Sequence, residues 1–304
     1  MLKITADIFS GRPNPEWIIE EAQAGPLLKD LSLSGAPAAM ESGFQGLGNR
    51  GLIVETLSDH HQKDFNLPDR FRLAGGGGAH EGLAAELAEK LLATMTQERA
   101  SHPMIVETQS KEAGAAPLDA NLRKFILEGL PGRQGSVLTV EPRAAEELKL
   151  EEHAASFLCG FEAGLFNPGF WNDPAHIGKN NCYNYASNHR TNTFAQPGRA
   201  SGHMYHAIDC ADVTNGAVSD GASLTCAPPN QAPRWFMALV IAPGWDYHWY
   251  RKSREGFWGH KPGGTAARNT DNSGVIIHDP RFANRGPYTI FCRFMFAQRK
   301  MVVR

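Results

Sequence analysis

Apolar and polar residues alternate at the start of the chain, and turn-forming residues follow. Alternate positions from Met1 to Phe9 are apolar, which is the spacing of a strand with one buried face. Residues 10–15 are rich in Gly, Pro and Asn and predict a turn directly after this strand. Short apolar runs at 52–57 and 71–73 predict two further strands.

Helical spacing of apolar residues appears in three later stretches. Leucines recur at helical intervals from Glu81 to Met95. The glycine-rich stretch before them, at 74–80, is interpreted as a hinge, because no GKS or GKT motif follows it to bind a phosphate. Residues 119–130 predict a short helix with a cap at its start, Asp119, and residues 142–166 predict the longest helix of the chain, ended by an Asn-Pro-Gly stop. A strand is expected at 135–141.

The second half of the chain predicts a helix followed by an antiparallel meander. We place a domain boundary near residue 140, with an N-terminal α+β domain of unassigned role over 1–140 and a second domain over 141–304. The elements expected in the second domain are a short helix at 180–189 and strands at 235–242, 246–251, 257–260, 275–277 and 288–297. This succession predicts the α+β fold class.

The composition is that of an ordinary globular protein. Of 304 residues, 42% are hydrophobic and 20% charged, which suffices for a packed core. The formal net charge of −2 gives no basic surplus for phosphates, so no nucleic-acid partner is expected. We find no signal-peptide pattern and no run near the roughly 20 apolar residues that cross a bilayer. The expectation is a soluble protein, cytoplasmic or exported by a route without a cleavable signal.

The cysteines predict reduced thiols, one of which is placed differently from the rest. The number of cysteines is odd, they are widely spread, and they form no CxxC pair. This is unlike the dense framework of a small disulfide-rich domain, so we expect most of them to be buried and reduced. The five are Cys159, Cys182, Cys210, Cys226 and Cys292.

Cys182 lies where a helix is expected to begin. A thiol in the first turn of a helix feels the positive end of the helix dipole, which favours the reactive thiolate. Cys182 is therefore a candidate nucleophile, with a buried cysteine that merely packs as the alternative. Its backbone N–H is a candidate oxyanion donor, and Asn180, Asn181 and Tyr183 are candidates for orienting the oxyanion or substrate. Asn180 and Asn181 are equally candidates for capping the helix.

Two histidines are predicted to meet across a hairpin. His248 lies in the strand 246–251 and His260 ends the strand 257–260, with a turn at Ser253–Gly256 between them. Cross-strand neighbours have Cβ atoms roughly 4.5–5.5 Å apart, which suits a hydrogen-bonded imidazole pair. His248 is then the candidate base for the thiol and His260 the residue that orients it. Two exposed sheet histidines are the alternative.

This order of residues resembles the papain-like cysteine hydrolases of the NlpC type over about residues 150–265. A helix-start cysteine, a strand with a histidine and a hairpin to a second polar residue carry the resemblance. It implies a papain-like C-terminal domain, in which the helix bearing Cys182 packs on an antiparallel sheet. It also implies a bacterial cysteine peptidase or amidase, or a related acyltransferase, that forms an acyl-enzyme and needs no cofactor. The implied substrate is a peptide or other amide, such as a cell-wall peptide.

Two other classes of function stay open. His203, His206 and Cys210 carry donors that suit zinc or copper, with Asp209 or Asp212 as a fourth ligand; His206 is also an alternative base for the thiol. In the other class, a papain-like domain without catalysis binds a partner in an aromatic cleft. The aromatic residues expected to wall a cleft, for substrate or partner, are Trp249, Tyr250 and Trp258.

Overall fold

The chain consists of two compact units, each of which is described by itself. One unit comprises Met1–Ile8 and Pro13–Val137, and the other comprises Phe9–Arg12 and Leu138–Arg304. The first half of the turn after the first strand is therefore part of the second unit, which the sequence did not indicate. The computed structural model describes residues 1–34, 44–57, 65–73, 81–101, 116–130, 161–225 and 234–304.

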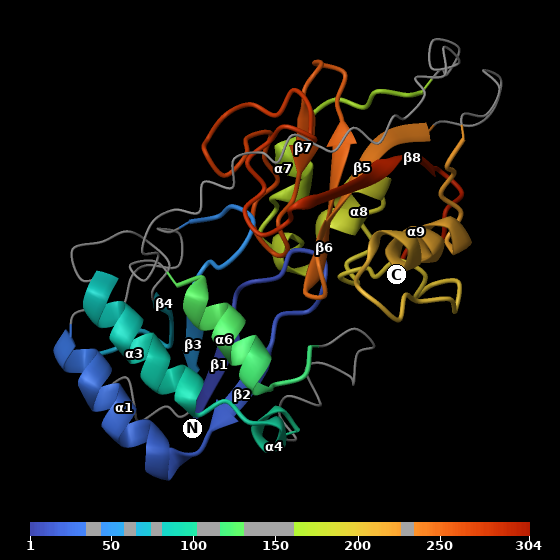
Figure 1. Cartoon of the computed structure of the whole chain (residues 1–304). Helices are drawn as coiled ribbons and strands as arrows, with labels where there is room; N and C mark the ends of the chain where they lie inside the picture. The colour runs from blue at the N-terminus through green and yellow to red at the C-terminus, as the bar shows by residue number, and fades with distance from the viewer. Residues whose placement is uncertain (35–43, 58–64, 74–80, 102–115, 131–160, 226–233) are drawn as a thin grey trace. The chain divides into compact units, whose positions relative to one another are not determined.

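The first unit contains a four-stranded antiparallel sheet in the order β2-β1-β3-β4 (Figure 1). Its strands are β1 (Leu2–Ala6), β2 (Glu16–Ile19), β3 (Leu52–Thr56) and β4 (Arg70–Leu73). Its described helices are α1 (Glu21–Ser34), α3 (Glu81–Ala93), α4 (Gln97–Ala100) and α6 (Ala120–Glu128).

The residue pattern predicts most but not all of these elements. The predictions of β1, β3, β4, α3 and α6 are confirmed. Asp119 caps α6 as expected, since its side chain accepts a hydrogen bond from the Leu122 N–H at 2.8 Å. β2 and α1 escaped prediction because β2 has four residues and α1 contains Gly25 and Pro26, so neither shows a long periodic pattern.

The second unit contains another four-stranded antiparallel sheet, in the order β7-β6-β5-β8. Its strands are β5 (Arg234–Ala242), β6 (Asp246–Lys252), β7 (Trp258–His260) and β8 (Ile290–Gln298). Its described helices are α7 (Pro168–Trp171), the 3-10 helix η2 (Ile177–Lys179), α8 (Cys182–Ser187) and α9 (Cys210–Ser219). Two antiparallel sheets with separate helices make the fold α+β, as the sequence predicts.

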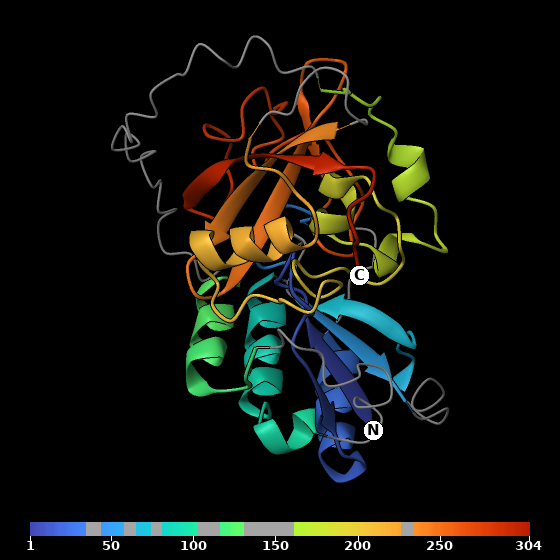
Figure 2. The same cartoon turned by 90° about the vertical axis from the view of Figure 1, so that its right-hand side faces the viewer.

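Two helices pack against this second sheet. α8 contacts β5 and β6, and α9 contacts β5; Figure 2 shows α9 lying against the strands. The buried side chains that pack together here include Tyr183 of α8, Val213 of α9 and Trp249 of β6. Burial of this apolar surface fixes α8, and therefore Cys182, on the sheet.

The long helix predicted over 142–166 is wrong in its described part. Residues 161–167 form no helix, and α7 begins only at Pro168. The segment lies against the sheet instead, where the Glu162 N–H donates to the Arg234 carbonyl at 2.8 Å. Contact with the sheet overrides the helical spacing of the sequence.

Several other expectations fall on residues without a described structure or give weaker elements. The remainder of that helix, the strand at 135–141, the glycine-rich stretch at 74–80 and the boundary near residue 140 lie outside the described residues. The strand predicted at 275–277 is reduced to one isolated bridge, between Thr270 and Ile276. Among the described helices, none has the length and apolar character that crossing a membrane requires.

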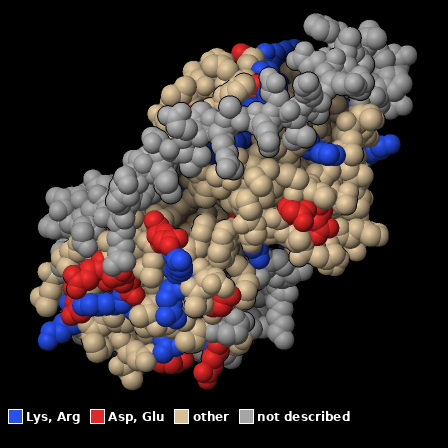
Figure 3. Space-filling model, viewed as in Figure 1, with Lys and Arg blue, Asp and Glu red and all other residues tan. Residues whose placement is uncertain are grey.

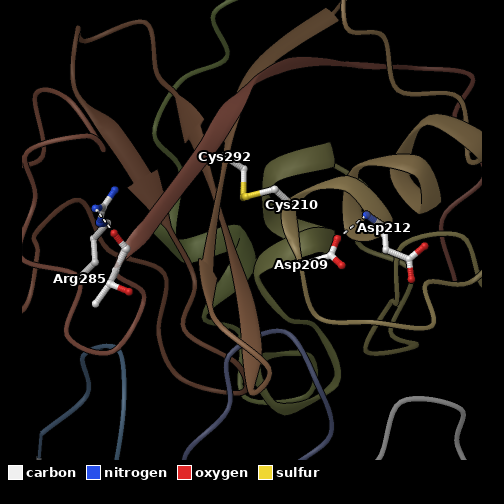
Figure 4. Close-up of a disulfide and its surroundings, with 6 residues drawn as sticks. Asp209, Cys210, Asp212, Arg285 and Cys292 are labelled. Carbon is white, nitrogen blue, oxygen red and sulfur yellow. Dashed lines mark hydrogen bonds between the residues drawn. A yellow bond between two sulfur atoms is a disulfide. The ribbon is translucent and has the colours of Figure 1, made fainter. Parts of the chain in front are cut away.

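A β-bulge in β8 directs Cys292 toward α9. The β5–β8 ladder shifts register between Leu239 and Val240, and Cys292 is the extra residue on β8. Bulges re-aim side chains, and Cys292 here forms a disulfide with Cys210 at the start of α9 (Figure 4). The expectation of reduced cysteines is therefore wrong for this pair.

The other cysteines divide between described and undescribed residues. Cys182 is the free cysteine of the described part of the chain, and Cys159 and Cys226 lie outside it. α9 itself lies in a stretch where the sequence analysis predicted no helix. Its Asp209 cap accepts a hydrogen bond from the Asp212 N–H at 2.8 Å.

Candidate functional site

Cys182 begins α8, as the sequence predicts. Asn181 is the N-cap, and it forms a reciprocal capping box with Asn184. The Asn181 side chain also donates to the carbonyls of Gly11 at 2.8 Å and Ala195 at 2.7 Å. Its side-chain oxygen caps the helix and its side-chain nitrogen is bonded to two carbonyls, which supports capping rather than oxyanion binding.

The thiol of Cys182 is in an environment that suppresses the thiolate. The side chain is 0% exposed, and its Sγ lies 4.0 Å from the Tyr247 carbonyl. Burial raises the pKa of the thiol, and the negative charge of Asp246 raises it further. The expectation that the helix start favours the thiolate is therefore wrong, because desolvation outweighs the helix dipole.

His248 and His260 form the hydrogen-bonded pair that the sequence predicts. His248 Nε2 lies 2.8 Å from His260 Nδ1, and both rings are buried. They are not directly opposite, however: β6 and β7 pair Tyr250 with His260. The two histidines are therefore diagonal neighbours, still within reach of long side chains. The turn of the hairpin includes Phe257 and is one residue longer than predicted, which moves the residue opposite His260 further from His248.

The carbonyl of Thr270 sets the direction of the hydrogen bonds through this pair. It lies 2.9 Å from His260 Nε2 and can only accept, so His260 carries its proton there. Burial lowers the pKa of His260 to about 3, which leaves the ring neutral and its Nδ1 an acceptor. The proton between the rings therefore belongs to His248 Nε2.

Ser10 completes the row of hydrogen bonds. Its Oγ lies 2.9 Å from His248 Nδ1, so His248 is bonded to Ser10 on one side and to His260 on the other. Ser10 is fully buried, and its hydroxyl also contacts the carbonyl of Tyr247 at 3.1 Å. Serine, histidine and histidine form a row of hydrogen bonds enclosed within the second unit.

The alternation of β6 separates Cys182 from the histidine pair. Cys182 packs in the core with Tyr247 and Trp249, whereas His248 packs its ring on Tyr250 and His260. Successive side chains of a strand point to opposite faces. The structure thus pairs the histidines with each other, while the thiol packs with the side chains of the other face and also lies beside the Ser10 side chain. Sequence spacing did not reveal this parity.

Asp246 anchors the segment that carries Ser10. Its carboxylate accepts the backbone N–H groups of Ser10 at 2.6 Å, Gly11 at 3.1 Å and Arg12 at 3.0 Å. It also accepts the Tyr288 hydroxyl at 2.5 Å. Burial raises the pKa of Asp246, and the hydrogen bonds counteract that rise in part. The sequence presented Ser10 only as part of a turn and Asp246 only as a strand start, so nothing in it signalled either role.

The remaining predicted site residues have structural partners. Asn180 donates to the carbonyl of His176 at 2.9 Å and to the Asn192 side chain at 2.8 Å. The Tyr183 hydroxyl donates to Asp220 at 2.9 Å. The predicted cleft residues are buried as well: Trp249, Tyr250 and Trp258. The expectation that these three wall a cleft is therefore wrong, because they fill the interior on the two faces of the sheet.

The alternative metal site is not assembled. The sulfur of Cys210 is bonded to Cys292 and is not available as a ligand. The Asp212 carboxylate accepts the N–H groups of His206 and Ala207 at 2.5 and 2.6 Å, which holds the loop before α9. Across the described residues, no group of three or more His, Cys, Asp or Glu side chains is arranged to hold a metal ion.

Comparison with known proteins gives one informative relative. The chain is 50% identical, over 126 residues, to a protein of Ruditapes philippinarum named insoluble matrix shell protein 1. The match covers 41% of this chain and 84% of the relative. No family model matches the chain, and no solved structure matches it.

This relative corrects the class of protein that the sequence suggested. The relative is a structural protein of a mollusc, whereas the resemblance to NlpC-type enzymes implied a bacterial hydrolase. The relative is at odds with the expected description as a bacterial hydrolase.

Proposed function

The chain belongs to the same family as insoluble matrix shell protein 1, and we propose that it is a non-catalytic structural module of an extracellular matrix. The observation that carries the proposal is the burial of the whole candidate cluster. Cys182, Ser10 and His248 are each 0% exposed, and His260 Nε2 is held by the carbonyl of Thr270. A cluster enclosed in this way supports stability and specific packing rather than turnover.

The disulfide supports a location outside the cytoplasm. Disulfides such as that between Cys210 and Cys292 form and persist in oxidising environments and are rare in the cytosol. A bridge across 82 residues of sequence also restricts the unfolded chain, which suits a protein that must persist in a matrix. A cytoplasmic location is not part of the proposal.

The papain-like arrangement enters the proposal as a scaffold. The packing of α8 on β5 and β6 is compatible with the helix-on-sheet arrangement that the resemblance implies. Fold and function separate readily in proteins. We propose that any shared architecture lies in this packing, and that the chemistry of the enzymes is not shared.

The surface charge is compatible with association between proteins. Figure 3 shows acidic and basic side chains in small interspersed groups on the face in view. With a net charge of −2, this pattern offers no extended basic stripe on that face for nucleic-acid phosphates. The partners proposed are other matrix proteins, including further copies of this chain.

The proposal predicts reversible assembly of the folded, disulfide-bonded protein. Full-length chain purified from an oxidising compartment should pass into a sedimentable or oligomeric form as its concentration rises. Near-ultraviolet circular dichroism should remain native, which separates assembly from aggregation of unfolded chain. A preparation that stays monomeric at every concentration would contradict the proposal.

The reactivity of Cys182 tests the absence of catalysis. If the thiol is as buried as described, iodoacetamide near neutral pH should label it only as fast as the folded chain opens. The control is the same reaction in urea, where Cys182 should react as a free cysteine. Rapid, stoichiometric labelling of Cys182 in the native protein would restore the nucleophile as a candidate.

A further inference from the structure

The outer edge of β8 is partly open. β8 is an edge strand of the second sheet, with β5 on its inner side. At Phe296 the outer edge is occupied, because Phe296 exchanges two backbone hydrogen bonds with Ser223, at 2.8 and 2.9 Å. The ladder stops there. The Ser223 hydroxyl instead bonds both backbone groups of Thr225, so that the chain bends at this point.

The open part of the edge is centred on Phe294. Backbone groups two residues apart in a strand point the same way, so the N–H and C=O of Phe294 face the same outer edge as those of Phe296. No residue of the described part of the chain bonds these two groups there. Open backbone groups of this kind are satisfied by another extended strand or by water.

An aromatic patch surrounds the same residue. The ring of Phe294 lies 5.0 Å from Phe236, 5.5 Å from Trp258 and 4.9 Å from Phe291, measured between ring centroids. Arg281 lies 5.6 Å from the Phe294 ring and 5.6 Å from the ring of Phe282. Aromatic and Arg side chains are the types enriched in protein interfaces.

The patch offers apolar contact more than charge. The Phe282 side chain is 78% exposed and that of Ile290, at the start of β8, is 43% exposed. Asp279 pairs with Arg281 at 2.7 Å, which offsets the charge of the guanidinium beside the rings. A strand that pairs with this edge would therefore be largely apolar.

We propose that the occupant is β8 of a second copy of this chain, paired antiparallel at Phe294, with the pairing confined to this residue because Ser223 occupies the edge at Phe296. β8 contains Ile290, Phe291 and Phe294 and no acidic residue, so it supplies the apolar strand that the patch requires. Backbone edges are self-complementary, and a two-fold axis places the same open groups opposite each other. This inference rests on the proposed matrix function, for which it supplies the first contact between copies.

Two matched substitutions test the contact. Phe294→Thr and Phe296→Thr each remove one ring that packs on Phe236, at 5.0 and 5.1 Å, and each insert a residue that favours strands. Only Phe294 lies on the open edge. Light scattering and sedimentation on the full-length protein measure assembly, and urea unfolding confirms that both variants are folded.

The expected result is a weaker assembly for one variant only. Phe294→Thr should raise the concentration needed for assembly by roughly tenfold or more, the effect of losing a central aromatic contact. Phe296→Thr should leave it near the wild-type value. Equal effects of the two variants, or none, overturn the β8 contact while the matrix function stands. A wild-type protein that never assembles overturns the matrix function as well.

Amide hydrogen exchange gives a readout that needs no substitution. In dilute protein the Phe294 N–H should exchange rapidly, and it should become protected as assembly proceeds. The Phe296 N–H, bonded to Ser223 within each copy, should be protected at every concentration. Protection of the Phe294 N–H in dilute monomer would show that another part of the same chain covers this edge, and the proposal would then be wrong.

Discussion

The imidazole of His260 is enclosed so fully that its pKa falls to about 3, because burial disfavours the charged ring. In the unfolded chain the same ring titrates near pH 6.5. Between these two values the unfolded chain binds a proton that the folded chain does not, so acid favours unfolding. Above about pH 6.5 neither state binds this proton, and the contribution to stability is complete.

We predict that His260→Gln flattens the acid side of the stability profile. Gln retains an N–H donor for the Thr270 carbonyl but cannot titrate. From about pH 6.5 down to about pH 4.5, His260 should cost the wild type up to about 1.4 kcal/mol of unfolding free energy per pH unit. Urea unfolding at several pH values should show that this loss is absent from the variant.

The comparison of the wild type with His260→Gln isolates the contribution of His260 to stability from the contributions of its neighbours. The raised pKa of Asp246 acts in the opposite direction, because it makes the folded chain bind a proton more readily. That contribution is present in both proteins. His206→Gln, at an exposed histidine, is the matched control. Equal acid slopes in the wild type and His260→Gln would refute the suppressed ionisation of His260.

At the scale of elements, a helix and a strand are joined by one covalent bond. α9 begins at Cys210, and the bulge of β8 turns Cys292 to meet it. The backbone of β8 pairs with β5 and not with α9. Side-chain packing and the disulfide therefore hold α9 and β8 together. The sulfur atoms link positions 82 residues apart, which is a long loop to close in the unfolded chain.

We predict that Cys292→Ser lowers the free energy of unfolding by about 2–4 kcal/mol, since it releases this constraint on the unfolded chain. Urea unfolding without reductant measures the loss. Cys210→Ser should cost a similar amount, and the double variant should cost little more than either single variant, because one bond is lost in all three. Additive costs would show that the two sulfur atoms are not bonded.

At the scale of the whole molecule, the chain enters the second unit twice. Phe9–Arg12 belongs to the second unit although Met1–Ile8 and Pro13–Val137 belong to the first. Asp246 holds this short segment through the N–H groups of its last three residues. The second unit is therefore completed by residues from the far end of the sequence.

We predict that Asp246→Asn loosens this segment and destabilises the protein by about 2–4 kcal/mol, because an amide nitrogen would face the donors that a carboxylate accepts. Urea unfolding measures the cost. Hydrogen exchange should also show faster exchange of the Ser10, Gly11 and Arg12 amides. Asp173→Asn, at an exposed carboxylate, is the control and should leave those amides unchanged. Unchanged protection in Asp246→Asn would contradict the anchoring role.

Local features of this protein followed from its sequence because they depend on neighbouring residues. Asn181 and Asp119 were identifiable as caps, since a cap bonds backbone groups two or three residues away. The hairpin that brings His248 near His260 was also visible, because its turn and strands are contiguous. The turn is one residue longer than predicted, which shifts the pairing of the two strands by one residue.

The candidate site was harder to predict because its partners are distant in sequence. Ser10 and His248 are 238 residues apart, and no periodicity links such positions. The burial of Cys182 depends on α8 and β6 closing over it, which a helix start does not reveal. The thiol therefore resembled a nucleophile in sequence, while its environment makes it a core residue.

The sequence by itself determined the α+β class, most strands, the start of α8 and the histidine hairpin. These depend on side-chain periodicity and local hydrogen bonds, which short segments specify. Only the tertiary structure decided which face of β6 holds Cys182, which cysteines pair, and that Phe9–Arg12 completes the second unit. Those features depend on desolvation and on contacts between distant segments, and neither exists until the chain has packed.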